Sequence, residues 1–223
     1  IISRIKIIFE AHRTRMNIVI TGASRGIGFE TAKLLASDSS NTLIALARSK
    51  AGLERLNHSC LSKNPAAKIF CFVFDLEKGD YSILGNEIRK RISSVDALIN
   101  NAGIFIGKPF QDITQADLIK TFNVNVFSVF KLTQQLLPMM KSGSHMVNIS
   151  SMGGMNGTSK FPGLSAYSSS KGALAILSEC LAEEFKPKQI SVNCLCLGAV
   201  QTEMLDKAFP NFKAPLTAEE MAK

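Results

Sequence analysis

Short apolar runs alternate with segments of helical periodicity along most of this chain. Near-continuous apolar runs are typical of strands that are covered on both faces. Six such runs predict the strands Asn17–Thr21, Thr42–Ala47, Lys68–Phe74, Ala97–Asn100, His145–Ser150 and Ser191–Leu197. The periodic segments between them predict helices near residues 26–37, 50–60, 81–93, 114–140 and 166–185.

This alternation predicts right-handed βαβ units, which build a doubly wound parallel sheet with helices on both faces. Residues 16–223 contain no internal linker, repeat or low-complexity stretch. A length of 223 residues, 46% of them hydrophobic, suits one domain with a sizeable core. We therefore expect a single α/β domain over residues 16–223.

Residues 1–15 do not follow this pattern. The segment is basic, and Met16 stands directly before the first predicted strand. It could be the tail of a targeting or membrane segment, or an extension upstream of the natural start. We favour the extension and expect it to lie outside the fold.

The charge distribution argues against a nucleic-acid partner. The 26 Lys and Arg residues exceed the 18 Asp and Glu residues by 8, an excess that can indicate a polyanionic ligand. Residues 1–15 carry four of these bases against one acid, and the other bases form no block. No stretch approaches the 18 uninterrupted apolar residues of a transmembrane helix, so we expect no membrane partner either.

The five cysteines include no CxxC pair, and no signal peptide is visible. We therefore expect reduced thiols and a cytoplasmic location. The three histidines are scattered without the spacing of a ligand cluster, so we expect no metal site.

Two predicted helices, 114–140 and 166–185, are apolar over more than one face. A helix that is apolar nearly all round is buried on more than one side. In a single domain, a second subunit would cover the outer face. We therefore expect a homodimer or homotetramer.

The turn TGASRGIG (21–28) follows the first strand and opens the first helix. Glycine is needed where the backbone turns tightly and approaches a pyrophosphate, and the helix N-terminus offers N–H groups to phosphates. Glycine-rich turns also occur without ligands, but this position favours a dinucleotide site. The second strand ends in Arg48, with no carboxylate to bind a ribose 2′-hydroxyl. Together with Arg25, this favours NADP(H) over NAD(H), although both could be ordinary surface residues.

Tyr167 and Lys171 lie four residues apart in a predicted helix, and therefore on one face of it. An adjacent ammonium lowers the pKa of a Tyr hydroxyl, which otherwise is a poor acid or base at neutral pH. This pair alone is a weak signal. However, Asn100–Gly103 and Ser150–Ser151 end two strands at the sheet edge where the glycine turn lies, and ligands bind at that edge.

With these residues in place, the sequence resembles the short-chain dehydrogenase/reductase family over about residues 16–223. The resemblance rests on TGASRGIG (21–28), FDL (74–76), NNAG (100–103), NVNVFSVF with Asn125, NISS (148–151), YSSSK (167–171) and SVNCLCLGAVQTEM (191–204), in the family's order. It implies a Rossmann-like sheet in three layers with strand order 3-2-1-4-5-6.

The resemblance implies a catalytic tetrad of Asn125, Ser151, Tyr167 and Lys171. Tyr167 would exchange the proton with the substrate oxygen, which Ser151 would position. Lys171 would lower the Tyr167 pKa and bind the nicotinamide ribose, while Asn125 would hold a water. The glycine turn and the resemblance together give the cofactor-binding residues Gly22, Ser24, Arg25, Gly26, Ile27, Gly28, Arg48, Asp75, Leu76, Asn101, Ala102, Gly103, Tyr167, Lys171, Gly198, Val200 and Thr202.

The sequence departs from the family's pattern in three places. The loop before Tyr167 is a few residues longer than usual, which leaves open whether Ser150 or Ser151 is the working hydroxyl. Leu197-Gly198 stands where the family usually has Pro-Gly. The chain ends before the family's usual seventh strand, so we expect a C-terminally incomplete domain whose last helix begins near Ala218, after the capping box of Thr217 and Glu220.

These observations predict an NADP(H)-dependent oxidoreductase that interconverts a small-molecule carbonyl and a secondary alcohol. An apolar substrate pocket, or ordinary loop core, is indicated by Met152, Met155, Phe161, Leu164, Met204 and Phe209. The alternative function is a non-catalytic, nucleotide-sensing protein on the same fold. A sensor would not need an ionisable Tyr–Lys pair beside a serine.

Overall fold

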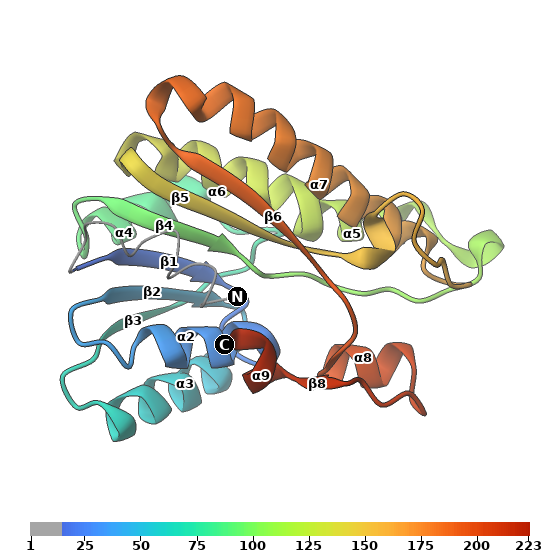
Figure 1. The fold of residues 1–223 in the computed structure, drawn as a ribbon, viewed down its shortest axis with the longest axis horizontal. Helices are drawn as coiled ribbons and strands as arrows, with labels where there is room; N and C mark the ends of the chain where they lie inside the picture. Colours follow the sequence, from blue (N-terminus) through green and yellow to red (C-terminus); the bar gives the residue numbers. More distant parts are fainter. Residues whose placement is uncertain (1–14) are drawn as a thin grey trace.

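Six parallel strands form the central sheet of the protein. The structure is a computed structural model that describes residues 15–223, so the N-terminal extension lies almost wholly outside the described residues. The strands are β1 (Asn17–Thr21), β2 (Thr42–Ala47), β3 (Lys68–Val73), β4 (Val95–Asn100), β5 (Met140–Ser151) and β6 (Ser191–Leu197). Their order is β3-β2-β1-β4-β5-β6 (Figure 1). This confirms the fold class and the strand order.

Helices cover both faces of the sheet (Figure 1). One face carries α2 (Gly26–Leu35) and α3 (Lys50–Lys63), and the other carries α4 (Tyr81–Arg89), α5 (Gln115–Phe122), α6 (Ser128–Leu136) and α7 (Ser165–Phe185). Successive residues of a strand point to opposite faces. Val19 accordingly packs in the core cluster on the α4–α7 side, while Ile18 and Ile20 pack in the cluster with α2 and α3. Burial on both faces explains why the strands appear in the sequence as unbroken apolar runs.

The segment predicted as one helix over 114–140 is helical from Gln115 to Met139, but it is not a single α-helix. A π-helical turn at Asn123–Phe127 separates α5 from α6, and Met140 already belongs to β5. The turn is held by the side chain of Asn125, whose Oδ1 accepts from the Ile104 N–H at 2.8 Å and whose Nδ2 donates to Ser170 Oγ at 2.9 Å. Single π turns of this kind are frequent at functional sites.

The C-terminal segment folds back across the carboxyl edge of the sheet. Val200–Gln201 (β7) pairs with Leu216–Thr217 (β8), and the short helix α8 (Glu203–Ala208) lies between them. The predicted capping box is present at the start of α9 (Ala218–Ala222), which packs against α2 (Figure 1). Within residues 15–223, no helix combines the length and the apolar character needed to cross a bilayer.

A buried polar ladder ties β4, β5 and α7 together. Asn100 Nδ2 donates to Asn148 Oδ1 at 2.8 Å, and Asn148 Nδ2 donates to Ser178 Oγ at 2.9 Å. All three side chains are buried. Buried polar groups are costly unless they are paired, so this ladder sets the register between α7 and the two strands.

Replacing Asn148 with Ala should lower the free energy of unfolding by about 1–3 kcal/mol, because the Asn100 amide would lose its buried acceptor. Denaturant unfolding measures the difference. Ser191→Ala, at the exposed start of β6, is the control and should change little. Equal stabilities of the Asn148 variant and the unmodified protein would show that the ladder is dispensable.

Candidate active site

A cavity of about 820 Å³ lies where the carboxyl ends of the strands meet. Every predicted cofactor-binding residue lines it, as do Ser150 and Ser151. Of the residues predicted to flank a substrate pocket, Met152, Phe161, Leu164, Met204 and Phe209 line the cavity, whereas Met155 lies outside its lining. The glycine turn and the Tyr–Lys pair, separated by about 140 residues in the chain, therefore share one site.

The glycine turn is shaped by the close approach of β1 to β4. Gly22 has a φ of +71°, and a Cβ atom there would lie 2.8 Å from Ala102 Cα. Asn101 locks the approach, because its side chain donates to Thr21 O and its N–H donates to Thr21 Oγ1, both at 3.0 Å. α2 starts at Gly26, and the side chain of its N-cap residue, Arg25, makes no capping hydrogen bond. Its first N–H groups can therefore take a phosphate, and the turn fits a dinucleotide.

Three arginines line the cavity. Arg48 follows β2, and Arg55 on α3 lines the same cavity. Arg55 was not predicted from the sequence as a cavity residue. The signal was its place on α3, the helix that starts directly after the end of β2 and Arg48. Arg25 also lines the cavity, and its guanidinium forms an ion pair with Glu203 of α8 at 2.7 Å.

Tyr167 and Ser151 both line the cavity. Burial raises the pKa of Tyr167, and the nearby Ser151 side chain acts in the opposite direction. The resemblance implied that Lys171 lowers this pKa, but in the structure burial dominates and the net shift is upward. Ser150 has a different role, since its buried hydroxyl donates to Lys171 O at 2.7 Å.

Lys171 is buried beside Tyr167. Its ammonium donates to Ile149 O at 2.7 Å and lies 5.9 Å from the centre of the Tyr167 ring. Burial lowers the pKa of Lys171 to about 8, an effect that the nearby Cys194 and Cys196 thiols oppose. The Lys171 ammonium is therefore held on the cavity wall, close to the Tyr167 ring.

Asn125 lies behind the cavity wall, outside the lining itself. It acts on the wall through Ile104, since Asn125 Nδ2 also donates to Ile104 O at 3.1 Å. Ser170, which the sequence reasoning missed, accepts from the same amide and donates to Tyr167 O at 2.7 Å. The Asn125 amide thus connects the loop after β4 to the helix that carries Tyr167.

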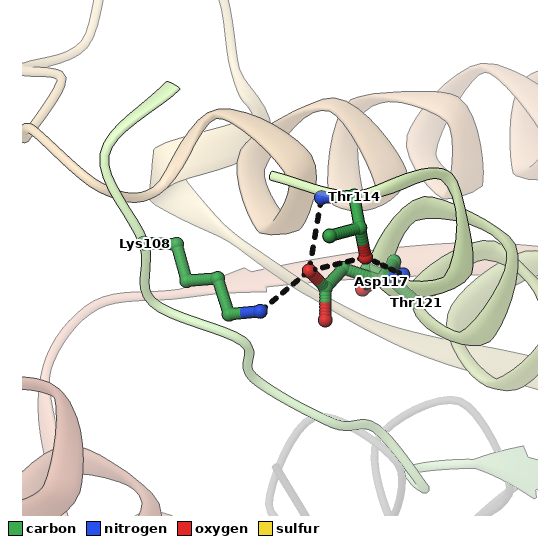
Figure 2. A network of polar contacts seen from close by, with 4 residues as sticks. All are labelled: Lys108, Thr114, Asp117 and Thr121. Atoms are coloured by element: carbon green, nitrogen blue, oxygen red, sulfur yellow. Dashed lines mark hydrogen bonds and ion pairs between the residues drawn. The ribbon is translucent and has the colours of Figure 1, made fainter. Parts of the chain in front are cut away.

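A polar network fixes the loop between β4 and α5 (Figure 2). Lys108 Nζ lies 2.6 Å from Asp117 Oδ2, which also accepts from the N–H and the hydroxyl of Thr114 (Figure 2). The Lys108 N–H donates to Gly163 O at 3.2 Å, so the network reaches the loop before α7. Two walls of the cavity are therefore held together.

The hydrogen bond from Lys108, followed by those from Thr114, lowers the pKa of Asp117 to about 2. A carboxyl group whose folded-state pKa lies below its unfolded value of 3.8 contributes stability above that value and loses it as pH falls towards 2. Thermal midpoints measured between about pH 5 and pH 2 should therefore fall more steeply for the unmodified protein than for Asp117→Asn. Asp112→Asn, at an exposed carboxyl of the same loop, should retain the steep fall. Parallel curves for the unmodified protein and the Asp117 variant would contradict this role.

Together, a glycine turn at the start of an uncapped helix, a parallel sheet and a buried Tyr–Lys pair near a serine are the features of a dinucleotide-dependent oxidoreductase. The family described as short chain dehydrogenase matches residues 16–212. The chain belongs to the short-chain dehydrogenase/reductase family, whose members named below include NAD(P)-dependent reductases of carbonyl groups.

Known proteins support this assignment. Ketoacyl reductase HetN of Nostoc sp. is 33% identical over 195 residues, which are 86% of this chain and 66% of that protein. Carbonyl reductase 2 (NADPH) of Sus scrofa is 33% identical, over 85% of this chain and 73% of its own length. Levodione reductase superposes with a TM-score of 0.85 at 25% identity, over 95% of this chain and 89% of that structure. A short-chain dehydrogenase of Shigella flexneri complexed with NADP superposes with a TM-score of 0.82 at 28% identity, over 93% of this chain and 87% of that structure.

Proposed function

We propose that this protein reduces carbonyl compounds to secondary alcohols with NADPH. The observation that carries the proposal is the meeting of Ser151, Tyr167 and Lys171 with the glycine turn in one cavity. A nucleotide sensor would use the turn and the arginines but would have no use for the buried phenol and ammonium.

A bound NADPH would supply the hydride. Tyr167 donates the proton to the carbonyl oxygen, because its phenol lines the cavity and is the acidic group paired with Ser151. The Ser151 hydroxyl is the one that positions the substrate oxygen, since the Ser150 hydroxyl is occupied by Lys171 O. Lys171 has three donors, one of which goes to Ile149 O, and its position in the lining suits contact with a ribose.

The preference for NADP(H) over NAD(H) rests on Arg48, Arg55 and Arg25 in the cavity lining. Guanidinium groups pair well with a phosphate monoester. The NADPH dependence in the name of the Sus scrofa relative and the NADP bound in the Shigella flexneri structure are consistent with this assignment.

Tyr167→Phe removes the phenolic hydroxyl and keeps the ring. The kcat for ketone reduction, followed by loss of NADPH absorbance, should fall about 10²–10⁴-fold, because a proton donor in the transition state contributes that much. The dissociation constant for NADPH should barely change. Tyr81→Phe is the matched control, since Tyr81 is the other of the two tyrosines and donates to Leu76 O instead. A Tyr167 variant that kept more than about a tenth of kcat would rule out this donor.

Arg48→Asp places an anion beside the expected 2′-phosphate. Loss of a charge-assisted hydrogen bond should weaken NADPH binding about 10–150-fold, with a much smaller effect on NADH. Titration calorimetry measures both. Lys63→Asp, at the exposed far end of α3, makes the same change in net charge and should bind NADPH normally. Equal NADPH affinities for the Arg48 variant and the unmodified protein would contradict the assignment.

We also propose that the outer face of α5–α7 joins two copies of the chain. Large apolar side chains are exposed there, namely Leu118, Ile119, Phe127, Phe130 and Ile176. A self-complementary patch of this kind suits an isologous, two-fold interface.

Ile176→Glu should therefore shift the protein towards monomer at micromolar concentration, because a buried carboxylate would face its own symmetry mate or an apolar partner. Light scattering gives the mass. Ile83→Glu on α4 changes an equally exposed isoleucine, 62% against 61%, and should leave the mass unchanged. A folded, unmodified protein that is already monomeric would refute the interface.

A further inference from the structure

The cavity separates charge from aromatic surface. Six charged side chains line it among the described residues, and they are Arg25, Arg48, Arg55, Asp75, Lys171 and Glu203. Arg25 and Glu203 pair with each other, and Lys171 is buried beneath Tyr167. Arg48, Arg55 and Asp75 belong to the ends of β2 and β3 and to α3, on the far side of the glycine turn from Tyr167. Around Tyr167, the described lining therefore offers one cation, the buried Lys171, besides the Arg25–Glu203 ion pair.

Aromatic rings also line the cavity. Phe105 packs edge-on against Tyr167, with ring centres 5.6 Å apart and planes at 73°. Phe161 and Phe209, which also line the cavity, meet edge-to-face at 5.6 Å, and Phe212 extends the group. Aromatic pairs in such geometry are individually favourable and give a wall of defined shape.

The apolar surface at this end remains open to water. Phe161 is 52% exposed and Met152 is 45% exposed, although both line the cavity. Large apolar side chains exposed at a cavity are typical of a ligand-binding surface. An apolar group bound there would remove this surface from water.

The aromatic wall is anchored to the cofactor turn. Phe209 directly follows α8, whose N-cap Thr202 lies against Gly26 and whose first residue, Glu203, pairs with Arg25. The wall is therefore held at a fixed place relative to the glycine turn and to Tyr167.

From this arrangement we propose that the substrate is an uncharged ketone that carries an aromatic or similarly bulky apolar group beside its carbonyl, held between Phe105 and the Phe161–Phe209 wall. This inference rests on the proposed carbonyl reduction and names its substrate class. Anionic 2-oxo acids are disfavoured, because their carboxylate would be desolvated against aromatic rings, and the one cation beside Tyr167, Lys171, already donates to Ile149 O and is assigned to the cofactor ribose. Small ketones are disfavoured because they leave the wall exposed.

Three dicarbonyl compounds separate these features. They are 1-phenyl-1,2-propanedione; 2,3-butanedione, which has a methyl group in place of the ring; and phenylpyruvate, which keeps a ring, one methylene away from its ketone, and carries a carboxylate. We expect kcat/KM with NADPH to be about 10–100-fold higher for the phenyl diketone than for either of the others.

Substitutions in the aromatic wall test which side chains cause the preference for the phenyl diketone. Phe161→Ala and Phe209→Ala should each reduce the preference for the phenyl diketone over butanedione about 5–30-fold while leaving NADPH affinity unchanged. Phe161→Leu keeps an apolar side chain and should retain part of the preference. Phe110→Ala removes a ring that is 79% exposed and outside the cavity lining, and it should behave as the unmodified protein.

A binding measurement tests the substrate class without depending on turnover. The inactive Tyr167→Phe variant, saturated with NADPH, should bind the phenyl diketone at least about tenfold more tightly than phenylpyruvate in titration calorimetry. Equal or better reduction of butanedione or phenylpyruvate would overturn the substrate class and leave carbonyl reduction intact. If none of the three compounds is reduced while other ketones are, the substrate class is wrong and carbonyl reduction stands. Binding of phenylpyruvate as tight as that of the diketone would also overturn the inference.

Discussion

The docking of α7 onto the carboxyl end of β5 is the interaction on which the rest of the site depends. Lys171 reaches into the sheet to Ile149 O, and Ser150 reaches back to Lys171 O, both at 2.7 Å. The helix lies so close to the turn after β5 that a Cβ atom on Gly172 would be 2.9 Å from Gly154 O. This approach brings the Tyr167 phenol to the Ser151 hydroxyl, at the edge where the glycine turn already lies.

The same docking produces the site's electrostatics. Burial of a phenol and an ammonium side by side moves both pKa values towards the neutral forms, upward for Tyr167 and downward for Lys171 to about 8. A neutral phenol is a proton donor, which is the form that carbonyl reduction needs. Arg48 and Arg55 line the cavity at the end of β2 and on α3, on the far side of the glycine turn from Tyr167, where a phosphate would belong.

The sheet could be predicted from the sequence because its central strands, β1, β2, β4 and β5, are buried on both faces over most of their length, and all six strands show as largely apolar runs. The residues that line the cavity could be predicted because the ends of parallel strands share one edge of the sheet. The π turn at Asn125 could not be found, since a single wide turn hardly disturbs apolar periodicity and is held by a contact with Ile104 about 20 residues away. The position of Arg55 in the cavity lining and the hydrogen bond from Lys108 to Gly163 could not be predicted either, because both depend on tertiary contacts that no local sequence pattern reports.

The choice between Ser150 and Ser151 also needed the structure. Adjacent strand residues point to opposite faces, but the sequence does not say which face meets Tyr167. The contact of Ser150 with Lys171 O and the contact of Ser151 with the phenol distinguish the two environments.

The central claim is that this cavity performs reduction rather than mere nucleotide binding. The most direct measurement is a single turnover with stoichiometric NADPH and a panel of uncharged ketones and 3-oxoacyl thioesters, in which nicotinamide oxidation and alcohol formation are both quantified. The account predicts one secondary alcohol for each NADPH oxidised with at least one member of the panel. Tight binding of NADPH with no oxidation across the whole panel would contradict it and would identify the protein as a nucleotide sensor.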